Sequence, residues 1–249
     1  MSELVKEYEV VVLSSDGRDL KMLDEEWSEV VDEDGNRLER CVTVEMNRQI
    51  SIWQDIKSVM ALIKVFREEK PDIIHSITPK AGLLCMIAAK WTRVPVRIHN
   101  FTGLIWPTAK GLKKWLLMAA DAMTCRCATH VIPESNGVMN DLQKITGKKM
   151  KVLGYGNIRG VNMEYYSRRP EVKEQADVLR RSDLFTFLFV GRLVKDKGVD
   201  ELIEAFERLH AKRRNCRLIL VGYYEGTLNP ISATSAEMIK NCDEIELKV

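Results

Sequence analysis

The most informative stretch of the sequence is Phe189-Val190-Gly191-Arg192-Leu193-Val194-Lys195-Asp196-Lys197-Gly198. It joins a mostly apolar run at residues 185–190, typical of a buried strand, to residues 199–210, whose apolar side chains recur at helical spacing. A second apolar run, residues 217–221, follows the helix. Strand, helix and strand in this order predict a β-α-β unit with parallel strands, and therefore an α/β fold.

The turn between this strand and helix has the composition of an anion site. Gly191 allows close approach of the backbone, Arg192 offers a planar set of donors, and Lys197 adds a positive charge. A helix that begins near Gly198 would add amide N–H groups and the positive end of its dipole. The alternative is that Arg192, Lys195 and Lys197 are solvated loop charges balanced by Asp196 and Asp200.

Two common nucleotide-binding motifs are absent from the sequence. The turn at 191–198 matches neither G-x-x-x-x-G-K-[ST] nor G-x-G-x-x-G. Residues 154–160 resemble the second motif but contain one residue too many, and we interpret them as a connecting turn. The sequence thus favours neither a P-loop ATPase nor a dinucleotide dehydrogenase.

The rest of the chain also alternates strands and helices. Strands are expected at residues 9–15, 40–45, 72–76, 96–99, 129–133 and 151–153, and helices at 53–69, 81–91, 110–127 and 135–145. This alternation predicts a parallel, doubly wound sheet. We expect a first Rossmann-like domain at residues 1–157, a linker at 158–182 and an incomplete second domain at 183–249, with at most one helix and one strand after residue 222.

Composition points to an ordinary soluble protein. Of the 249 residues, 45% are hydrophobic and 30% charged, and no run approaches the ~18 apolar residues of a membrane span. The segment after Met1 lacks the basic and apolar regions of a secretory signal, so we expect a cytoplasmic protein. The net charge of +2 gives no argument for nucleic-acid binding.

The cysteines do not form a recognisable metal motif. The six lie at positions 41, 85, 125, 127, 216 and 242, and the closest pair lacks the spacing of a zinc site. We expect reduced thiols, no metal and no cofactor.

Two further turns follow predicted strands of the first domain, where ligands of α/β sheets bind. In residues 75–82, His75 and Lys80 could face a cleft, and Thr78 with Pro79 could open a helix. Residues 99–104 place His99, Thr102 and Gly103 in the same kind of position. The alternative is that each histidine is a hydrogen-bonded structural residue.

Basic and bulky apolar residues alternate between Lys110 and Met118 on the predicted helix 110–127. We favour a surface helix whose apolar face lies in the core. The alternative is a helix that contacts an anionic membrane surface, here the inner membrane.

Taken together, these segments resemble family 4 glycosyltransferases, in particular bacterial enzymes that build capsular or other surface polysaccharides on a lipid carrier. The resemblance rests on FVGRLVKDKGVDELIEAF (189–206), HSITPKAGL (75–83), VPVRIHNFTGL (94–104) and the Gly-Asn to Gly-Val-Asn turn (156–162).

The resemblance implies a GT-B fold and a retaining enzyme that transfers a sugar from a nucleotide-diphosphate sugar to a glycan or lipid-linked glycan. Arg192 and Lys197 would bind the donor diphosphate and offset the charge of the leaving group, so we expect them to be catalytic. We assign Gly191 and Gly222 to donor binding as well, and we expect a UDP-sugar. His75, Thr78, Lys80, His99, Thr102 and Gly103 would lie on the acceptor side.

The sequence departs from the family pattern at three places. Thr102 stands where many relatives have histidine, which leaves it only a hydrogen-bonding role. The family's first strand and glycine loop, expected before a helix at Ser2 to Lys6, and its two-glutamate motif, expected after Val249, are missing. We therefore expect a chain short at both ends, inactive alone, with uncovered apolar strand and helix faces in the second domain.

Two other functions compete with this interpretation. A non-catalytic remnant would bind a nucleotide or merely persist as a fold. A nucleotide-sugar epimerase would share the GT-B architecture, but the family segments point away from it.

Overall fold

The structure is a computed structural model that describes residues 7–14, 39–46, 51–157, 160–181, 183–224 and 229–248. The chain divides into two compact units, Met1–Val161 (unit 1) and Asn162–Val249 (unit 2). The helix expected at Ser2–Lys6 and residues 158, 159 and 182 of the expected linker lie outside the described residues.

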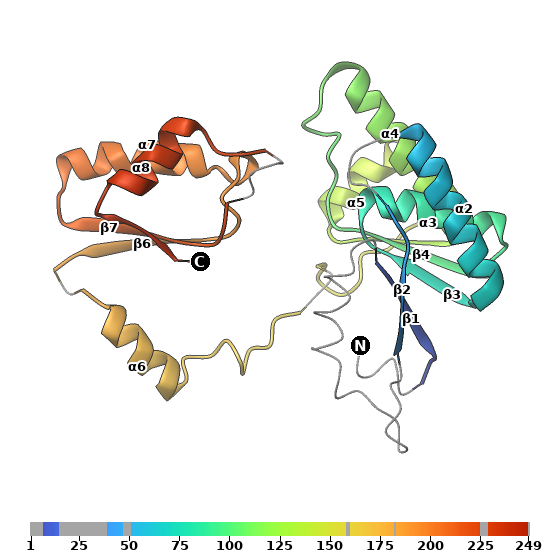
Figure 1. Cartoon of the computed structure of the whole chain (residues 1–249), viewed down its shortest axis with the longest axis horizontal. Helices are drawn as coiled ribbons and strands as arrows, with labels where there is room; N and C mark the ends of the chain where they lie inside the picture. The colour runs from blue at the N-terminus through green and yellow to red at the C-terminus, as the bar shows by residue number, and fades with distance from the viewer. Residues whose placement is uncertain are drawn as a thin grey trace. The chain divides into compact units, whose positions relative to one another are not determined.

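Unit 1 contains parallel strands and helices in alternation (Figure 1). β1 (Val10–Ser14) pairs with β2 (Glu39–Thr43), and a second sheet has the order β3 (Ile73–Ser76), β4 (Val96–Phe101), β5 (His130–Pro133). The helices are α2 (Ile52–Glu69), α3 (Pro79–Trp91), α4 (Gly111–Cys127) and α5 (Asn136–Gln143). All of these strand pairs are parallel, as predicted.

One expected strand does not form. Residues 151–153 have no strand structure, because the chain turns where the Gly156 amide donates to the Leu153 carbonyl at 2.9 Å. The next amide, that of Asn157, then donates to the carbonyl of Glu134. This segment therefore caps the end of β5 instead of extending the sheet.

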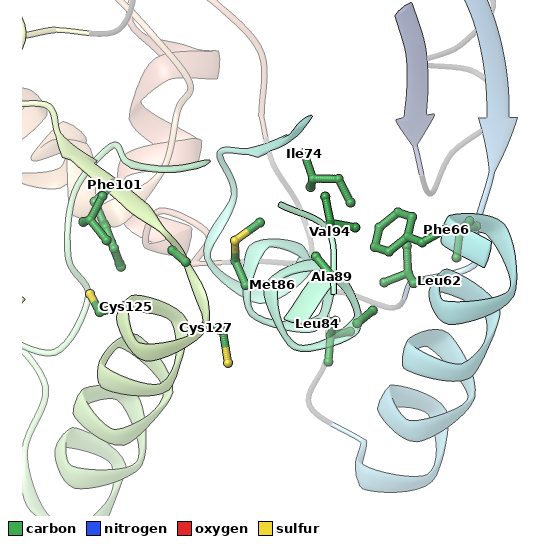
Figure 2. Packing of buried hydrophobic residues seen from close by; sticks show 14 of the residues in the cluster. Leu62, Phe66, Ile74, Leu84, Met86, Ala89, Val94, Phe101, Cys125 and Cys127 are labelled. Atoms are coloured by element: carbon green, nitrogen blue, oxygen red, sulfur yellow. The ribbon is translucent and has the colours of Figure 1, made fainter. Parts of the chain in front are cut away.

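The core of unit 1 lies among its helices and strands. Leu62 and Phe66 of α2 face Leu84 and Ala89 of α3, as Figure 2 shows. Val44, which follows β2, belongs to the same buried cluster, and its amide donates to the Ser14 carbonyl at 2.9 Å. Shared apolar burial thus joins the two sheets of unit 1.

Unit 2 is a smaller parallel sheet with the order β6 (Phe185–Val190), β7 (Cys216–Val221), β8 (Ile245–Lys248). A short 3₁₀ turn, η1 (Lys195–Lys197), precedes α7 (Val199–Lys212), and α8 (Ala233–Asn241) precedes β8. The helix and strand expected after residue 222 are therefore present. Another helix, α6 (Pro170–Leu179), lies within the expected linker.

The two faces of this sheet differ. α7 and α8 lie over one face (Figure 1), where Ile203, Phe206, Leu218 and Leu220 are buried. On the other face Leu188 and Val190 are 65% and 70% exposed, so an apolar strand face is uncovered, as expected from the sequence.

Arg217 of β7 also lies on this face of the sheet, but its side chain is buried. Its guanidinium donates to Thr186 Oγ1 and Glu246 Oε1, both at 2.9 Å, and to the carbonyl of Leu179 at the end of α6. One arginine therefore joins β6, β7, β8 and α6.

Candidate functional site

Two glycine turns touch at the carboxyl ends of β6 and β7. Gly191 follows β6 and Gly222 follows β7, and an added Cβ at Gly222 would lie 2.0 Å from the Gly191 carbonyl oxygen. Gly222 also has φ +148°, a conformation that side chains oppose. Gly222 requires glycine because its backbone lies too close to that of Gly191 for any side chain.

Backbone hydrogen bonds and two buried apolar side chains fix the loop after Gly191. The Leu193 amide donates to Tyr223 O at 2.9 Å, and the Lys195 amide donates to Asn229 O at 3.0 Å. Leu193 and Val194 are both 1% exposed. The loop is thus fixed from within, while Arg192 and Lys197 lie exposed on its outer side.

The acidic residues near this loop have partners of their own. Asp196 Oδ1 accepts from Asn229 Nδ2 at 2.6 Å, and Asp200 Oδ1 accepts from the Ser232 amide at 2.9 Å. Hydrogen bonds, first from the Ser235 hydroxyl and then from the Ser232 amide, hold the pKa of Asp200 below its usual value. Across the described parts of the chain, no ion pair joins the Lys197 ammonium to a carboxylate.

The N-terminus of α7 is less open to an anion than the sequence suggests. Gly198 has φ +71° and caps the helix, as its position predicts. The first turn carries Asp200 and Glu201, whose negative charges already interact favourably with the helix dipole. An anion at this turn would therefore depend mainly on Arg192 and Lys197.

The strand ends of β3 and β4 in unit 1 are joined by two side-chain hydrogen bonds. His75 Nε2 lies 3.1 Å from Asn100 Oδ1, and Ser76 Oγ lies 2.7 Å from His99 Nδ1. His75 is exposed, whereas His99 is only 1% exposed. The structure thus separates two histidines that the sequence treats alike.

His99 is packed against α3 as a structural residue. An added Cβ at Gly82 would lie 2.3 Å from His99 Cε1, so this helix position must be glycine. Burial, followed by the nearby His75, lowers the pKa of His99 to about 4. The ring is neutral at pH 7 and does not face solvent, which matches the structural alternative.

The remaining acceptor-side candidates lie at the start of α3 and after the end of β4. Lys80 Nζ lies 2.7 Å from Asp55 Oδ1 and thereby ties α3 to α2. Thr78 is the N-cap of α3, but its side chain makes no capping hydrogen bond. Thr102 is exposed beyond β4, where it can contact a ligand.

A carboxylate that the sequence reading did not select lies near this position. A Cβ added to Gly103 would be 3.8 Å from Glu134 Oε1, which places Glu134 beside the turn after β4. Glu134 directly follows β5, and its amide donates to the Phe101 carbonyl at 3.0 Å. The strand-end rule, extended to β5, would have identified it.

The basic apolar segment of α4 is exposed, contrary to the orientation favoured from sequence. Leu112, Trp115 and Leu116 are 76%, 68% and 61% exposed. The buried residues of α4 are Thr124, Cys125 and Cys127, all in its last turns. Within the described ranges, no helix has the length and apolar character needed to cross a bilayer.

Comparisons with known families cover most of the chain. Residues 1–156 match the glycosyl transferase 4-like domain family, and residues 171–246 match the family of glycosyl transferases group 1.

Two curated relatives are also glycosyltransferases. The capsular polysaccharide biosynthesis glycosyltransferase CapM of Staphylococcus aureus is 35% identical over 225 residues, which are 88% of this chain and 55% of CapM. An Escherichia coli enzyme, UDP-Gal:alpha-D-GlcNAc-diphosphoundecaprenol alpha-1,3-galactosyltransferase, is 30% identical over 160 residues, 61% of this chain and 40% of that enzyme. The chain thus spans about half the length of these relatives.

Solved structures with the same fold include a UDP complex and a UDP-GlcNAc 2-epimerase. Anabaena HepE in complex with UDP has a TM-score of 0.64 at 19% identity, over 99% of this chain and 63% of HepE. The UDP-GlcNAc 2-epimerase of Neisseria meningitidis has a TM-score of 0.63 at 15% identity, over 98% of this chain and 66% of the epimerase. These similarities establish the α/β fold, whereas the sequence families distinguish transferase from epimerase.

Replacement of Gly222 by alanine tests the glycine contact. We expect Gly222→Ala to destabilise unit 2 by roughly 2–4 kcal/mol, because the new Cβ clashes with Gly191 and φ is unfavourable. Hydrogen exchange of β6 and β7 should become faster. Gly147→Ala, where an added Cβ meets nothing within 4 Å, is the control, and equal exchange in both variants would contradict the close contact.

Burial of His99 predicts a pH dependence of unit 1. Between its ordinary pKa of 6.5 and about 4, the unfolded chain binds a proton that the folded chain does not, so stability falls as pH falls. From pH 7 to pH 5 the loss should be about 2 kcal/mol. Urea unfolding followed by tryptophan fluorescence reports this unit, because all five tryptophans precede residue 162.

The variants His99→Gln and His130→Gln separate this effect from general acid sensitivity. His99→Gln should lose most of the pH dependence, whereas His130→Gln, altered at an exposed side chain, should keep it. The same pH dependence in the wild type and in His99→Gln would show that other groups cause it.

Proposed function

Because the chain belongs to the glycosyltransferase family defined by its 4-like and group 1 domains, we propose that it transfers a sugar from a nucleotide-diphosphate sugar. The acceptor in this proposal is a glycan or lipid-linked glycan of a capsular or other surface polysaccharide. The two curated relatives support this class, since one acts in capsule biosynthesis and the other on a diphosphoundecaprenol-linked sugar.

The observation that carries the proposal is the loop held by the Gly191–Gly222 contact. Its backbone is fixed by apolar burial and by hydrogen bonds to residues 223 and 229, while the side chains of Arg192 and Lys197 lie exposed. Such a preorganised backbone suits the binding of a diphosphate by the two cations, because the loop itself needs little ordering when the ligand binds. The bound UDP in HepE supports a UDP-sugar as the donor.

The catalytic part of the proposal follows from charge. When the glycosidic bond to the donor breaks, negative charge grows on the leaving diphosphate. Arg192 and Lys197 would stabilise this charge without a metal ion. We also propose that the transfer retains the anomeric configuration of the sugar, because the family that the sequence resembles does so.

The acceptor side of the proposal lies in unit 1. His75, Thr102 and Glu134 are polar residues at the carboxyl ends of β3, β4 and β5, and Gly103 leaves space beside Glu134. These groups can donate to or accept from sugar hydroxyls. His99 and Lys80 contribute by positioning β4 and α3, since one is buried and the other is ion-paired.

Nucleotide titration tests the donor site on the 249-residue chain itself. Isothermal titration with UDP and with GDP should detect binding of UDP, and Arg192→Ala and Lys197→Ala should each weaken it at least about tenfold, as expected for charge-assisted hydrogen bonds. Arg208→Ala is the control, because Arg208 is an exposed arginine of α7 paired with Glu204. Failure of both nucleotides to bind, or unchanged affinity in the two variants, would contradict the site.

A second part of the proposal concerns the membrane, where a lipid-linked acceptor resides. The N-terminal half of α4 exposes Leu112, Trp115 and Leu116 beside the exposed Lys110 and Lys113. Apolar side chains flanked by lysines suit the interface of an anionic bilayer. We therefore propose peripheral contact of α4 with the inner surface of the cytoplasmic membrane.

Sedimentation with phosphatidylglycerol vesicles at low salt tests this contact. The wild-type chain should sediment with the vesicles, and Trp115→Ala should reduce the bound fraction severalfold because it removes the largest exposed apolar group of this surface. Trp91→Ala is a matched control, since Trp91 of α3 is 71% exposed. A wild-type chain that stays in the supernatant would count against membrane contact.

A further inference from the structure

Three potential metal ligands converge where α7, α8 and β8 meet. His210 lies in the last turns of α7, Cys242 follows α8, and Glu244 immediately precedes β8. One ligand atom from each lies within 4.8 Å of the other two. Within this group, Cys242 Sγ is 3.5 Å from Glu244 Oε2 and His210 Nε2 is 3.9 Å from Glu244 Oε1.

His210 provides an independent reason to consider a ligand here. The residue is only 6% exposed, and its Nε2 atom has no hydrogen-bond partner among the described residues. Its separation from Glu244 is too long for a hydrogen bond. A buried imidazole nitrogen is costly to leave unsatisfied, and a cation between it and Glu244 would satisfy it.

The chemistry of the three groups restricts the cation. An imidazole nitrogen, a thiolate and a carboxylate are the ligands that Zn²⁺ takes, usually with tetrahedral geometry and bonds of about 2.0–2.3 Å. Such bonds place the ligand atoms about 3.3–3.8 Å apart. The separations of 3.5 and 3.9 Å are to different oxygens of Glu244, and one ligand atom of each residue lies within 4.8 Å of the others, so the side chains must draw together for one ion to reach all three.

We propose that His210, Cys242 and Glu244 bind one Zn²⁺ ion, with a water molecule as the fourth ligand. On binding, the S–H bond of Cys242 breaks, an S–Zn bond forms, and the proton passes to solvent. Because the thiol must lose a proton, binding becomes tighter as pH rises. This proposal differs from the expectation from sequence that the chain has no metal site, which stays a prediction.

The position of the site indicates a structural role. It lies where α7 ends and β8 begins, at the amino end of the strands, whereas Gly191 and Gly222 lie at their carboxyl ends. The ion would join both helices to β8 and hold the buried face of the sheet together. It would take no part in donor binding, so the proposed transfer reaction does not depend on it.

Cobalt titration of the chelator-treated 249-residue chain tests the site, because Co²⁺ substitutes for zinc and reports its ligands by absorption. One equivalent of Co²⁺ should produce a thiolate charge-transfer band, and added Zn²⁺ should abolish the band. In competition with a chromophoric chelator, Cys242→Ser and Glu244→Gln should each weaken zinc binding at least about tenfold. Cys242→Ser should also lose the band, while Glu244→Gln should keep it.

Matched controls identify the source of any signal. Cys85→Ser changes a cysteine of unit 1 and should leave the band and zinc affinity unchanged. Zinc should raise the unfolding temperature of the wild type but not that of Cys242→Ser. Absence of the band in the wild type, or a band that persists in Cys242→Ser, would overturn the assignment and leave a hydrogen-bonded Cys–Glu pair beside the histidine.

Discussion

The contact between the backbones at Gly191 and Gly222 determines the arrangement of the carboxyl edge of unit 2. The absence of a side chain at Gly222 lets the Gly191 carbonyl lie against it, and the Leu193 amide then donates to the Tyr223 carbonyl. The exposed positions of Arg192 and Lys197 follow from this, since the buried side of the loop is occupied by Leu193 and Val194.

The two units use their strand ends differently. In unit 1, the side chains after β3 and β4 hydrogen-bond to one another, and His99 is buried as a neutral ring against Gly82. In unit 2, the strand ends meet through backbone, and the cations remain exposed. Exposed cations suit a charged ligand. On this basis we propose the donor side in unit 2 and the acceptor side in unit 1.

Local sequence patterns predicted most of the elements. The strand at residues 185–190 and the start of the following helix at Val199 agree with the structure, because an apolar run and a helical stripe have different periods. The prediction of a strand at 151–153 was wrong. A strand also needs a hydrogen-bonded partner strand, and here the backbone forms a turn instead. Helical spacing likewise reveals an apolar face but not what covers it, so the exposure of Trp115 could not be derived.

The candidate sites also differ in how far the sequence predicts them. The glycine turn after β6 was predicted because all its residues are adjacent in sequence. The buried state of His99 depends on Gly82, which is far from it in the chain, and strand position alone gave the two histidines equal weight. The cluster of His210, Cys242 and Glu244 has no spacing typical of a metal motif, since His210 meets the neighbouring Cys242 and Glu244 only through the packing of α7 on α8. Tertiary contacts of this kind leave no local signal in one sequence.

The open face of the sheet in unit 2 has a consequence for the behaviour of the protein in concentrated solution. β6 is an edge strand in the order β6-β7-β8, and its six residues FTFLFV carry no charge, no proline and no glycine. Natural edge strands usually contain a lysine, a bulge or a proline that prevents pairing with another chain. With Leu188 and Val190 exposed beside that edge, the chain presents a short segment able to stack between molecules.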